Sequence, residues 1–202
     1  MTRAQLDLST LPVGESVPVA LKECVLSCQP DVIVNAAAYT AVDRAESDIQ
    51  QAELLNTYVP GWLAALASEL GACLVHYSTD YVFADTKQIP YKETDNTGPV
   101  EQLSVYGKTK LAGEQAIEEV FRLAQNLERS HDEDNFSRYF ILRTSWIYGD
   151  SGNFIRTMLR LAGECDQLSV VADQIGAPTS AQWLAEVTLQ MAGSRAESGV
   201  YH

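Results

Sequence analysis

Short apolar runs alternate along the chain with longer segments whose apolar residues recur at helical spacing. The runs predict buried strands, and the longer segments predict helices bounded by Gly, Pro or small polar residues. Strands are expected from Asp31, from Cys73 and over 139–147 and 168–171, and helices over 15–28, 49–70, 153–163, 180–191 and around Tyr106. Alternating strands and helices are typical of an α/β fold with a doubly wound parallel sheet.

Two of these strands end in residues that suit a ligand site. The strand from Cys73 runs into Ser78, Thr79 and Asp80, and the strand from Asp31 runs into small residues at 36–38. Open parallel sheets bind ligands at the carboxyl ends of their strands. We therefore expect a binding site at this edge of the sheet.

Tyr106 and Lys110 lie four positions apart in a predicted helix and so share one face of it. A free tyrosine has a pKa of about 10, and a fixed cation nearby lowers that pKa by favouring the phenolate. The pair can therefore move a proton near neutral pH. Because this spacing is common on surface helices, it carries weight only together with the two strand ends.

Five stretches, in this order, resemble the extended short-chain dehydrogenase/reductase superfamily and, more narrowly, the dTDP-4-dehydrorhamnose reductase family. They are DVIVNAAAYTAVDRAES at 31–47, VHYSTDYVF at 75–83, YGKTKLAGE at 106–114, LRTSWIY at 142–148 and DQIGAPT at 173–179. The resemblance implies a Rossmann-like fold and the NADPH-dependent reduction of the C4 ketone of dTDP-4-dehydro-L-rhamnose. The product, dTDP-L-rhamnose, serves cell-surface polysaccharide biosynthesis, and NADH remains open as the hydride donor.

The same resemblance implies a role for each matching residue. Tyr106 protonates the developing alkoxide, Lys110 lowers the pKa of that tyrosine, and Thr79 forms a hydrogen bond at the same oxygen. The implied cofactor-binding residues are Asp7, Ala37, Ala38, Thr40, Tyr106 and Lys110, and the implied substrate-binding residues are Thr79, Asp80 and Trp146. The loop 174–179 is expected to close over the nucleotide sugar.

Dinucleotide-binding folds open with a strand, a glycine-rich turn and a helix whose N-terminus binds the pyrophosphate. No such segment precedes Asp31 in this sequence, and residues 6–9 resemble the end of the family's third strand. We expect residues 1–202 to form a partial NAD(P)-binding Rossmann-like domain that lacks the first βαβ unit and includes part of the substrate-binding region. The strand from Asp31 would then have an open, apolar edge, and residues 199–202 would begin a further strand.

The chain has 202 residues, a formal net charge of −13 and a sequence pI near 4.5. This charge argues against binding to nucleic acid or to an anionic membrane, because both require a basic surface. The four cysteines show no metal-ligand spacing, so we expect no metal site and four free thiols that are at least partly buried. We expect a cytoplasmic location, a nucleotide-sugar substrate as the partner molecule, and leave a homodimer open.

Two alternatives to this enzyme remain. One is a non-catalytic regulatory subunit resembling the methionine adenosyltransferase beta subunit, and the other is an epimerase or dehydratase of the same superfamily. Two departures from the family also bear on the substrate: the polar stretch 128–138 and the approach 99–104 to Tyr106 look longer than usual. The first is expected to be a solvated loop.

Overall fold

The structure is a computed structural model that describes residues 2–14, 16–85, 87–128, 137–150, 153–170 and 173–202. Its α-helices are α1 (Val19–Cys28), α2 (Val42–Ala45), α3 (Ile49–Glu53), α4 (Val59–Leu70), α5 (Val105–Glu128), α6 (Phe154–Glu164) and α7 (Ala181–Ala192). Its strands are β1 (Val32–Asn35), β2 (Cys73–Thr79), β3 (Tyr139–Tyr148), β4 (Pro178–Ser180) and β5 (Gly199–Tyr201). A π-helical turn, η2 (Leu54–Tyr58), joins α3 to α4, and 3₁₀ turns cover Leu8–Thr10 (η1), Asp80–Val82 (η3) and Val100–Gln102 (η4).

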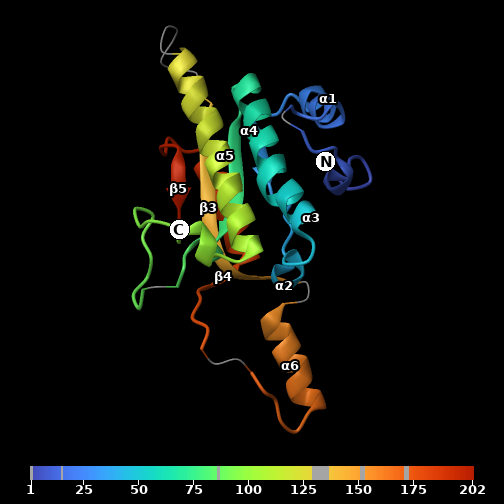
Figure 1. Ribbon diagram of the computed structural model, residues 1–202, viewed down its shortest axis with the longest axis vertical. Coiled ribbons are helices and arrows are strands. Elements are labelled where there is room, and N and C mark those ends of the chain that lie inside the picture. Colours follow the sequence, from blue (N-terminus) through green and yellow to red (C-terminus); the bar gives the residue numbers. More distant parts are fainter. Residues whose placement is uncertain (1, 15, 86, 129–136, 151–152, 171–172) are drawn as a thin grey trace. The chain divides into compact units, whose positions relative to one another are not determined.

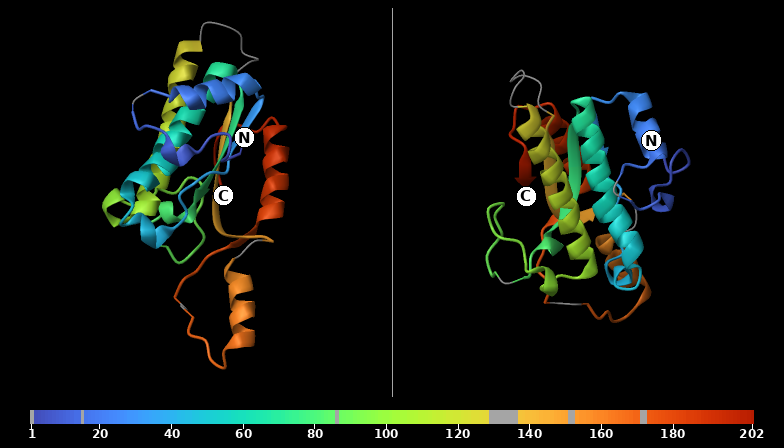
Figure 2. Two further views of the ribbon diagram at one scale, coloured as in Figure 1. Left: turned by 90° about the vertical axis from the view of Figure 1, so that its right-hand side faces the viewer. Right: turned by 45° about the horizontal axis from the view of Figure 1, so that its top comes forward.

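The chain forms two compact units, unit 1 (Met1–Arg143 with Ala196–His202) and unit 2 (Thr144–Arg195). In unit 1 the strands lie in the order β1-β2-β3, and β5 pairs with β3. Every strand pairing with a described register is parallel, which confirms the expected parallel sheet. Helices α1, α4 and α5 lie on the same side of these strands, with α4 and α5 side by side (Figures 1 and 2).

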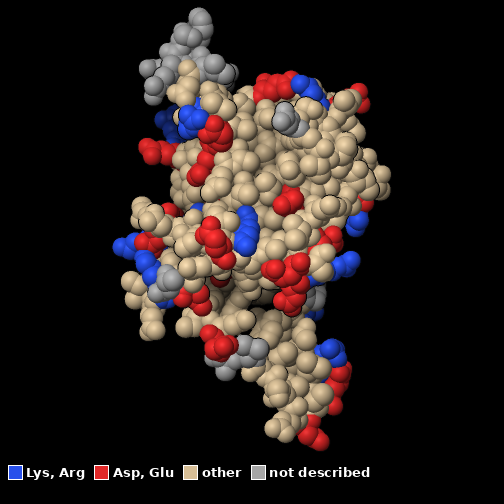
Figure 3. Space-filling view, in the orientation of Figure 1, with Lys and Arg blue, Asp and Glu red and all other residues tan. Residues whose placement is uncertain are grey.

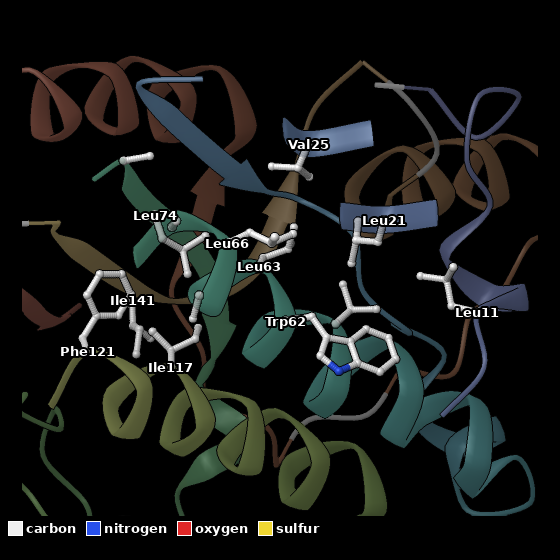
Figure 4. Packing of buried hydrophobic residues seen from close by; sticks show 14 of the residues in the cluster. Leu11, Leu21, Val25, Trp62, Leu63, Leu66, Leu74, Ile117, Phe121 and Ile141 are labelled. Carbon is white, nitrogen blue, oxygen red and sulfur yellow. The ribbon is translucent and has the colours of Figure 1, made fainter. Parts of the chain in front are cut away.

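The main hydrophobic core of unit 1 lies between these helices and the sheet. Trp62, Leu63 and Leu66 of α4 pack with Ile117 of α5 and with Leu74 of β2 (Figure 4). Leu66, Leu74 and Ile117 are fully buried, so the core fixes how α4 and α5 lie on β2. Both helices reach the carboxyl end of β2, where the predicted site lies.

The segment expected as one helix over 49–70 contains a π-helical turn at its centre. Pro60 has no backbone N–H, so Asn56 O lacks the donor that a continuous α-helix would offer it. The helix ends at Gly71, whose φ of 67° lies in the left-handed region that favours glycine. The end was therefore predicted correctly, and the interruption was missed.

Three other expectations differ from the structure. The first helix begins at Val19 rather than at residue 15, because Pro18 fixes φ and disfavours a helical residue before it. Residues 6–9 contain no strand and instead lead into η1, which the Asp7 side chain caps. Residues 168–170 are irregular, and Val171 and the loop at 129–136 lie outside the described residues.

Strand β1 lies at the edge of the unit 1 sheet and, among the described residues, pairs with β2 alone. Val32 and Val34 are 38% and 44% exposed, although their sequence is that of a buried strand. The open, apolar edge expected for this strand is therefore present in the structure.

Unit 2 contains the last part of β3, which pairs with β4, and the helices α6 and α7. The β3–β4 register shifts between Ser145 and Ile147, so Trp146 falls at an irregularity of the strand. Asn153 and Ser180 cap α6 and α7 through their side chains. These two caps place both helices within a residue of the sequence prediction.

The face of the molecule in Figure 3 shows no basic stripe among its described residues. On the face in Figure 3, Lys and Arg side chains are interspersed with Asp and Glu, in keeping with the excess of acidic residues in the sequence. No helix among the described residues has the length and hydrophobicity that crossing a membrane would require. All four cysteines are free, but Cys28 and Cys165 are exposed, so the expectation of burial is wrong for these two.

Candidate active site

The carboxyl end of β2 places three side chains of the predicted site. Thr79 is buried and caps η3, since its Oγ1 accepts the Tyr81 N–H at 3.2 Å. The same hydroxyl donates to Asp80 Oδ1 at 3.2 Å. The strand thus ends in a tight turn that presents a hydroxyl and a carboxylate side by side.

Helix α5 brings Tyr106 to this turn through a close backbone approach. A Cβ on Gly107 would fall within 3.0 Å of the Tyr81 carbonyl oxygen, and one on Gly113 would fall within 3.0 Å of the Asn56 carbonyl oxygen. Only glycine allows α5 to lie this close to η3 and η2. The two glycines therefore fix how far Tyr106 stands from the end of β2.

Tyr106 lies beside Thr79 and against the ring of Tyr81. The Tyr106 and Thr79 side chains are hydrogen-bonded, and the Tyr81 and Tyr106 rings meet edge to face at 5.4 Å between centroids. Burial raises the pKa of Tyr106, the bond with Thr79 lowers it, and the charges of Asp80 and Tyr81 raise it further. The net direction is upward, so the side chain is a neutral phenol at pH 7.

Lys110 lies one helical turn after Tyr106 and is 1% exposed. Its Nζ donates to the Tyr77 carbonyl oxygen at 2.6 Å and lies 3.0 Å from His76 Nε2. Burial lowers the pKa of Lys110 from 10.5 to about 8, and the charge of Glu114 opposes that shift. The expected lowering of the Tyr106 pKa by Lys110 is absent here, because the amino group faces β2 and burial dominates at the tyrosine.

Asn35 and His76 extend this buried polar contact to the edge strand. Asn35 Nδ2 lies 3.0 Å from His76 Nδ1, and the two residues pair in the β1–β2 register. Asn35 Oδ1 accepts the Ala37 N–H at 3.1 Å. His76 is fully buried, and sequence reasoning missed the chain of contacts from Ala37 to Lys110.

A buried ion pair lies one turn further along α5. Arg143 of β3 binds both oxygens of Glu114, with Nη2 to Oε2 at 2.6 Å, and Ser78 donates to Oε1 of the same carboxylate. The side chains of Arg143 and Glu114 are 8% and 2% exposed. Sequence reasoning did not single out this pair, although Glu114 follows Tyr106 and Lys110 at helical spacing on the same face.

Asn56, at the π-helical turn, is a further residue that sequence reasoning missed. Its Oδ1 accepts the Tyr39 N–H at 2.9 Å, and its Nδ2 donates to Tyr39 O at 3.1 Å and to Thr109 Oγ1 at 3.2 Å. The side chain is fully buried and joins the segment after β1 to α5 beside Lys110. Pro60 was the sequence signal for an irregular helix at this point, and π-helical turns are frequent at functional sites.

A pocket of about 630 Å³ lies beside β1 and is called the β1 pocket here. Three of the predicted cofactor residues line it: Asp7, Ala37 and Ala38. Hydrogen bonds from Ser9 and Arg3 lower the pKa of Asp7 to about 2, so its carboxylate is ionised. Thr40 is exposed and is not among the lining residues.

Trp146 belongs to unit 2 and adopts an unusual backbone conformation. Its φ is 45°, its residue exposure is 45%, and a Cβ on Gly176 would fall within 3.0 Å of its ring. A non-glycine residue in the left-handed region stores strain, which is most often found at functional positions. The indole therefore packs on the loop expected to close over the substrate, within unit 2.

Comparison with known proteins adds an independent line of argument. A family model described as the RmlD substrate binding domain matches residues 13–202. The dTDP-4-dehydrorhamnose reductases of Salmonella typhimurium and Escherichia coli K12 are 49% and 45% identical to the chain, each over 192 residues, which make up 93% of this chain and 58% of each relative. The chain thus spans little more than half the length of these relatives.

A solved structure agrees with this match. The dTDP-4-dehydrorhamnose reductase of Bacillus anthracis, determined in complex with NADP, has a TM-score of 0.81 and 34% identity, and the match covers 100% of this chain and 64% of that one. A second reductase, from Clostridium acetobutylicum, gives a TM-score of 0.80 at 35% identity, covering 100% of this chain and 63% of that one. The Rossmann-like α/β fold is thereby confirmed, and the chain belongs to the RmlD family of dTDP-4-dehydrorhamnose reductases.

Proposed function

We propose that this chain carries the catalytic region of an NADPH-dependent reductase that converts the C4 ketone of dTDP-4-dehydro-L-rhamnose to dTDP-L-rhamnose. The observation that carries the proposal is the hydrogen-bonded Tyr106 and Thr79 pair at the carboxyl end of β2, with Lys110 one turn away. Membership of the RmlD family supports the choice of reaction and sugar nucleotide.

Tyr106 acts as the general acid. Its raised pKa keeps the phenol protonated at neutral pH, so it can donate to the alkoxide that forms at C4. When the Thr79 hydroxyl turns its single proton from Asp80 to Tyr106, it stabilises the phenolate that remains after the proton leaves. Asp80 accepts a hydrogen bond from Thr79, and we assign its carboxylate to the binding of the sugar.

The β1 pocket fits one end of a dinucleotide. Its volume of about 630 Å³ is in the range of small-molecule sites, and the alanines at 36–38 leave the backbone open to a ligand. Bound NADPH would supply the hydride to C4. Asp7 is the proposed binding residue toward the adenine side, and Ala37, Ala38 and Thr40 are proposed to line the cofactor. Tyr106 and Lys110 are the proposed binding residues toward the nicotinamide ribose.

The substrate side of the proposal involves unit 2. Trp146 packs on Gly176 of the loop 174–179, and we assign both to the binding of the nucleotide sugar. Relatives that match the chain are named as reductases, which favours the enzyme over a non-catalytic subunit resembling the methionine adenosyltransferase beta subunit. A cytoplasmic location and a homodimer are part of the same proposal.

The test is an assay with NADPH and dTDP-4-dehydro-L-rhamnose of the chain extended upstream by a strand, a glycine-rich turn and a helix, the unit that residues 1–202 are expected to lack. We expect NADPH to be oxidised and dTDP-L-rhamnose to be identified as the product by NMR. Tyr106→Phe should lower the turnover about 10²-fold or more, because it removes the acid. Tyr139→Phe is the matched control, since Tyr139 packs on Phe121 in the core and should keep full activity. Equal turnover in Tyr106→Phe and the unmodified chain would refute the assignment.

A further inference from the structure

The buried contacts between β1 and Lys110 restrict which nitrogen of His76 can carry a proton. Ala37, Asn35, His76 and Lys110 form one chain of contacts, with donor–acceptor distances of 3.1, 3.0 and 3.0 Å. The three side chains are 4%, 0% and 1% exposed. Buried polar groups of this kind must satisfy one another.

The backbone N–H of Ala37 sets the direction of the whole chain. An N–H can only donate, so the Asn35 oxygen faces it and the Asn35 amide nitrogen faces His76 Nδ1. That nitrogen donates as well, so His76 Nδ1 accepts. A neutral imidazole then carries its proton on Nε2, which points at Lys110 Nζ.

This tautomer fits only one charge state of Lys110. An ammonium group has donors and no acceptor, whereas a neutral amine can accept the Nε2–H of His76. A charged Lys110 instead fits the other tautomer, with the proton on Nδ1. That tautomer needs the Asn35 amide to turn over, which breaks its bond to the Ala37 N–H.

The other groups around Lys110 are accounted for. On α5, Glu114 favours the ammonium form, and Arg143 of β3 binds both oxygens of that carboxylate. The Tyr77 carbonyl of β2 accepts a bond from either form. The Thr109 hydroxyl is uncharged and accepts a hydrogen bond from Asn56 of η2. The charges of Asp80 and Tyr81 in η3 raise the pKa of Tyr106. The pKa of Lys110 is lowered, as expected where the surroundings favour the neutral amine.

We propose that Asn35 and His76 are positioning residues that couple the protonation state of Lys110 to the backbone turn after β1. Ala37 lines the β1 pocket, so a ligand oxygen that takes the Ala37 N–H frees the Asn35 amide to turn over. His76 can then accept from a charged Lys110. A carbonyl or hydroxyl oxygen of a bound dinucleotide has the required chemistry, and this last step rests on the proposed function.

The first test is the tautomer of His76, read from its ¹⁵N chemical shifts in the unmodified chain and assigned with His76→Gln. We expect the fraction with the proton on Nε2 to rise with pH along the same curve as the deprotonation of Lys110, followed by ¹³Cε NMR and assigned with Lys110→Met. The proposal would be overturned if His76 carried its proton on Nδ1 at every pH, or if its tautomer did not change as Lys110 titrates. The measurement is made on the unmodified chain, and the two variants serve only to assign the NMR signals.

The second test changes Asn35. In Asn35→Asp both oxygens accept, so the Ala37 N–H stays bonded while His76 carries its proton on Nδ1, and the pKa of Lys110 should rise by about one unit or more. Asn35→Leu removes the donor without adding a charge and should shift the pKa of Lys110 in the same direction by a smaller amount. An unchanged pKa of Lys110 in both variants contradicts the coupling.

Turnover separates this proposal from the function on which it rests. If the chain reduces the ketone, the pH midpoint of turnover in Asn35→Asp should move upward together with the NMR pKa of Lys110. If the chain reduces no ketone but the tautomer still follows Lys110, then the proposed function fails and the coupling stands.

Discussion

Replacing Lys110 with Met should change how the stability of the protein depends on pH. The side chain is 1% exposed, and its pKa falls from 10.5 in an unperturbed lysine to about 8 in the folded chain. The unfolded chain therefore holds a proton on this lysine between about pH 8 and 10.5 that the folded chain has released. Stability of the unmodified protein rises with pH across this window, since the unfolded state binds more protons there.

The size of the effect follows from the two pKa values. One pKa unit corresponds to 1.36 kcal/mol, so a difference of about 2.5 units makes burial of the charged lysine cost about 3 kcal/mol at pH 7. Met removes this cost, but it also removes the contacts of Lys110 with the Tyr77 carbonyl and with His76 Nε2, and each loss costs about 1–3 kcal/mol. These contributions offset one another at pH 7, whereas the change of the stability difference with pH comes from the titration of Lys110.

The assay is urea unfolding of both proteins at several pH values from 7 to 10, followed by circular dichroism. Relative to Lys110→Met, the unmodified protein should gain up to about 3 kcal/mol over the full window between the two pKa values. Lys22→Met is the matched control, because Lys22 is half exposed in a surface pair with Glu69 and its replacement should give no such slope. Parallel stability curves for the unmodified protein and Lys110→Met would refute the reasoning.

The remaining predictions concern the groups around this lysine. Glu114→Gln strips a buried guanidinium of its partner and should lower the free energy of unfolding by about 3–5 kcal/mol, measured in urea, whereas the surface variant Glu119→Gln should scarcely change it. Gly107→Ala forces α5 away from the Tyr81 carbonyl and should lower kcat about 10²-fold, while far-UV circular dichroism stays unchanged. Burial and the charge of Lys110 lower the pKa of His76 well below 6.5. The unfolded chain then binds a proton at His76 that the folded chain does not bind, so the free energy of unfolding should fall as the pH falls through 6.5. Acid unfolding of His76→Gln should not show this dependence on pH.

Local sequence patterns predicted most of the fold because its strands and helices follow their own periodicity. Gly71 ended its helix as expected, and Tyr106 and Lys110 share the face that their spacing required. The contacts that decide charge were harder to foresee, because they join residues far apart in sequence. His76 reaches Lys110 across 34 positions, and Arg143 reaches Glu114 across 29.

Backbone irregularities were the other limit. The left-handed φ of Trp146 coincides with the register shift between β3 and β4, which no local pattern encodes. The π-helical turn at Asn56 did have a local signal in Pro60, but its use as a link between Tyr39 and Thr109 depends on where α5 packs. The sequence therefore predicted that Thr79, Tyr106 and Lys110 lie near one strand end, and the structure added the contacts that support them.

The close approach of α5 at Gly107 and Gly113 also bears on how this site tolerates mutation. Both contacts are made to backbone carbonyl oxygens, so the contact at Gly107 does not depend on which side chain stands at position 81. Variation at Tyr81 can therefore alter what surrounds the substrate while the helix stays in place. Substitutions in the turn beside Tyr106 should therefore leave the position of this side chain unchanged, whereas substitutions at Gly107 or Gly113 should move it.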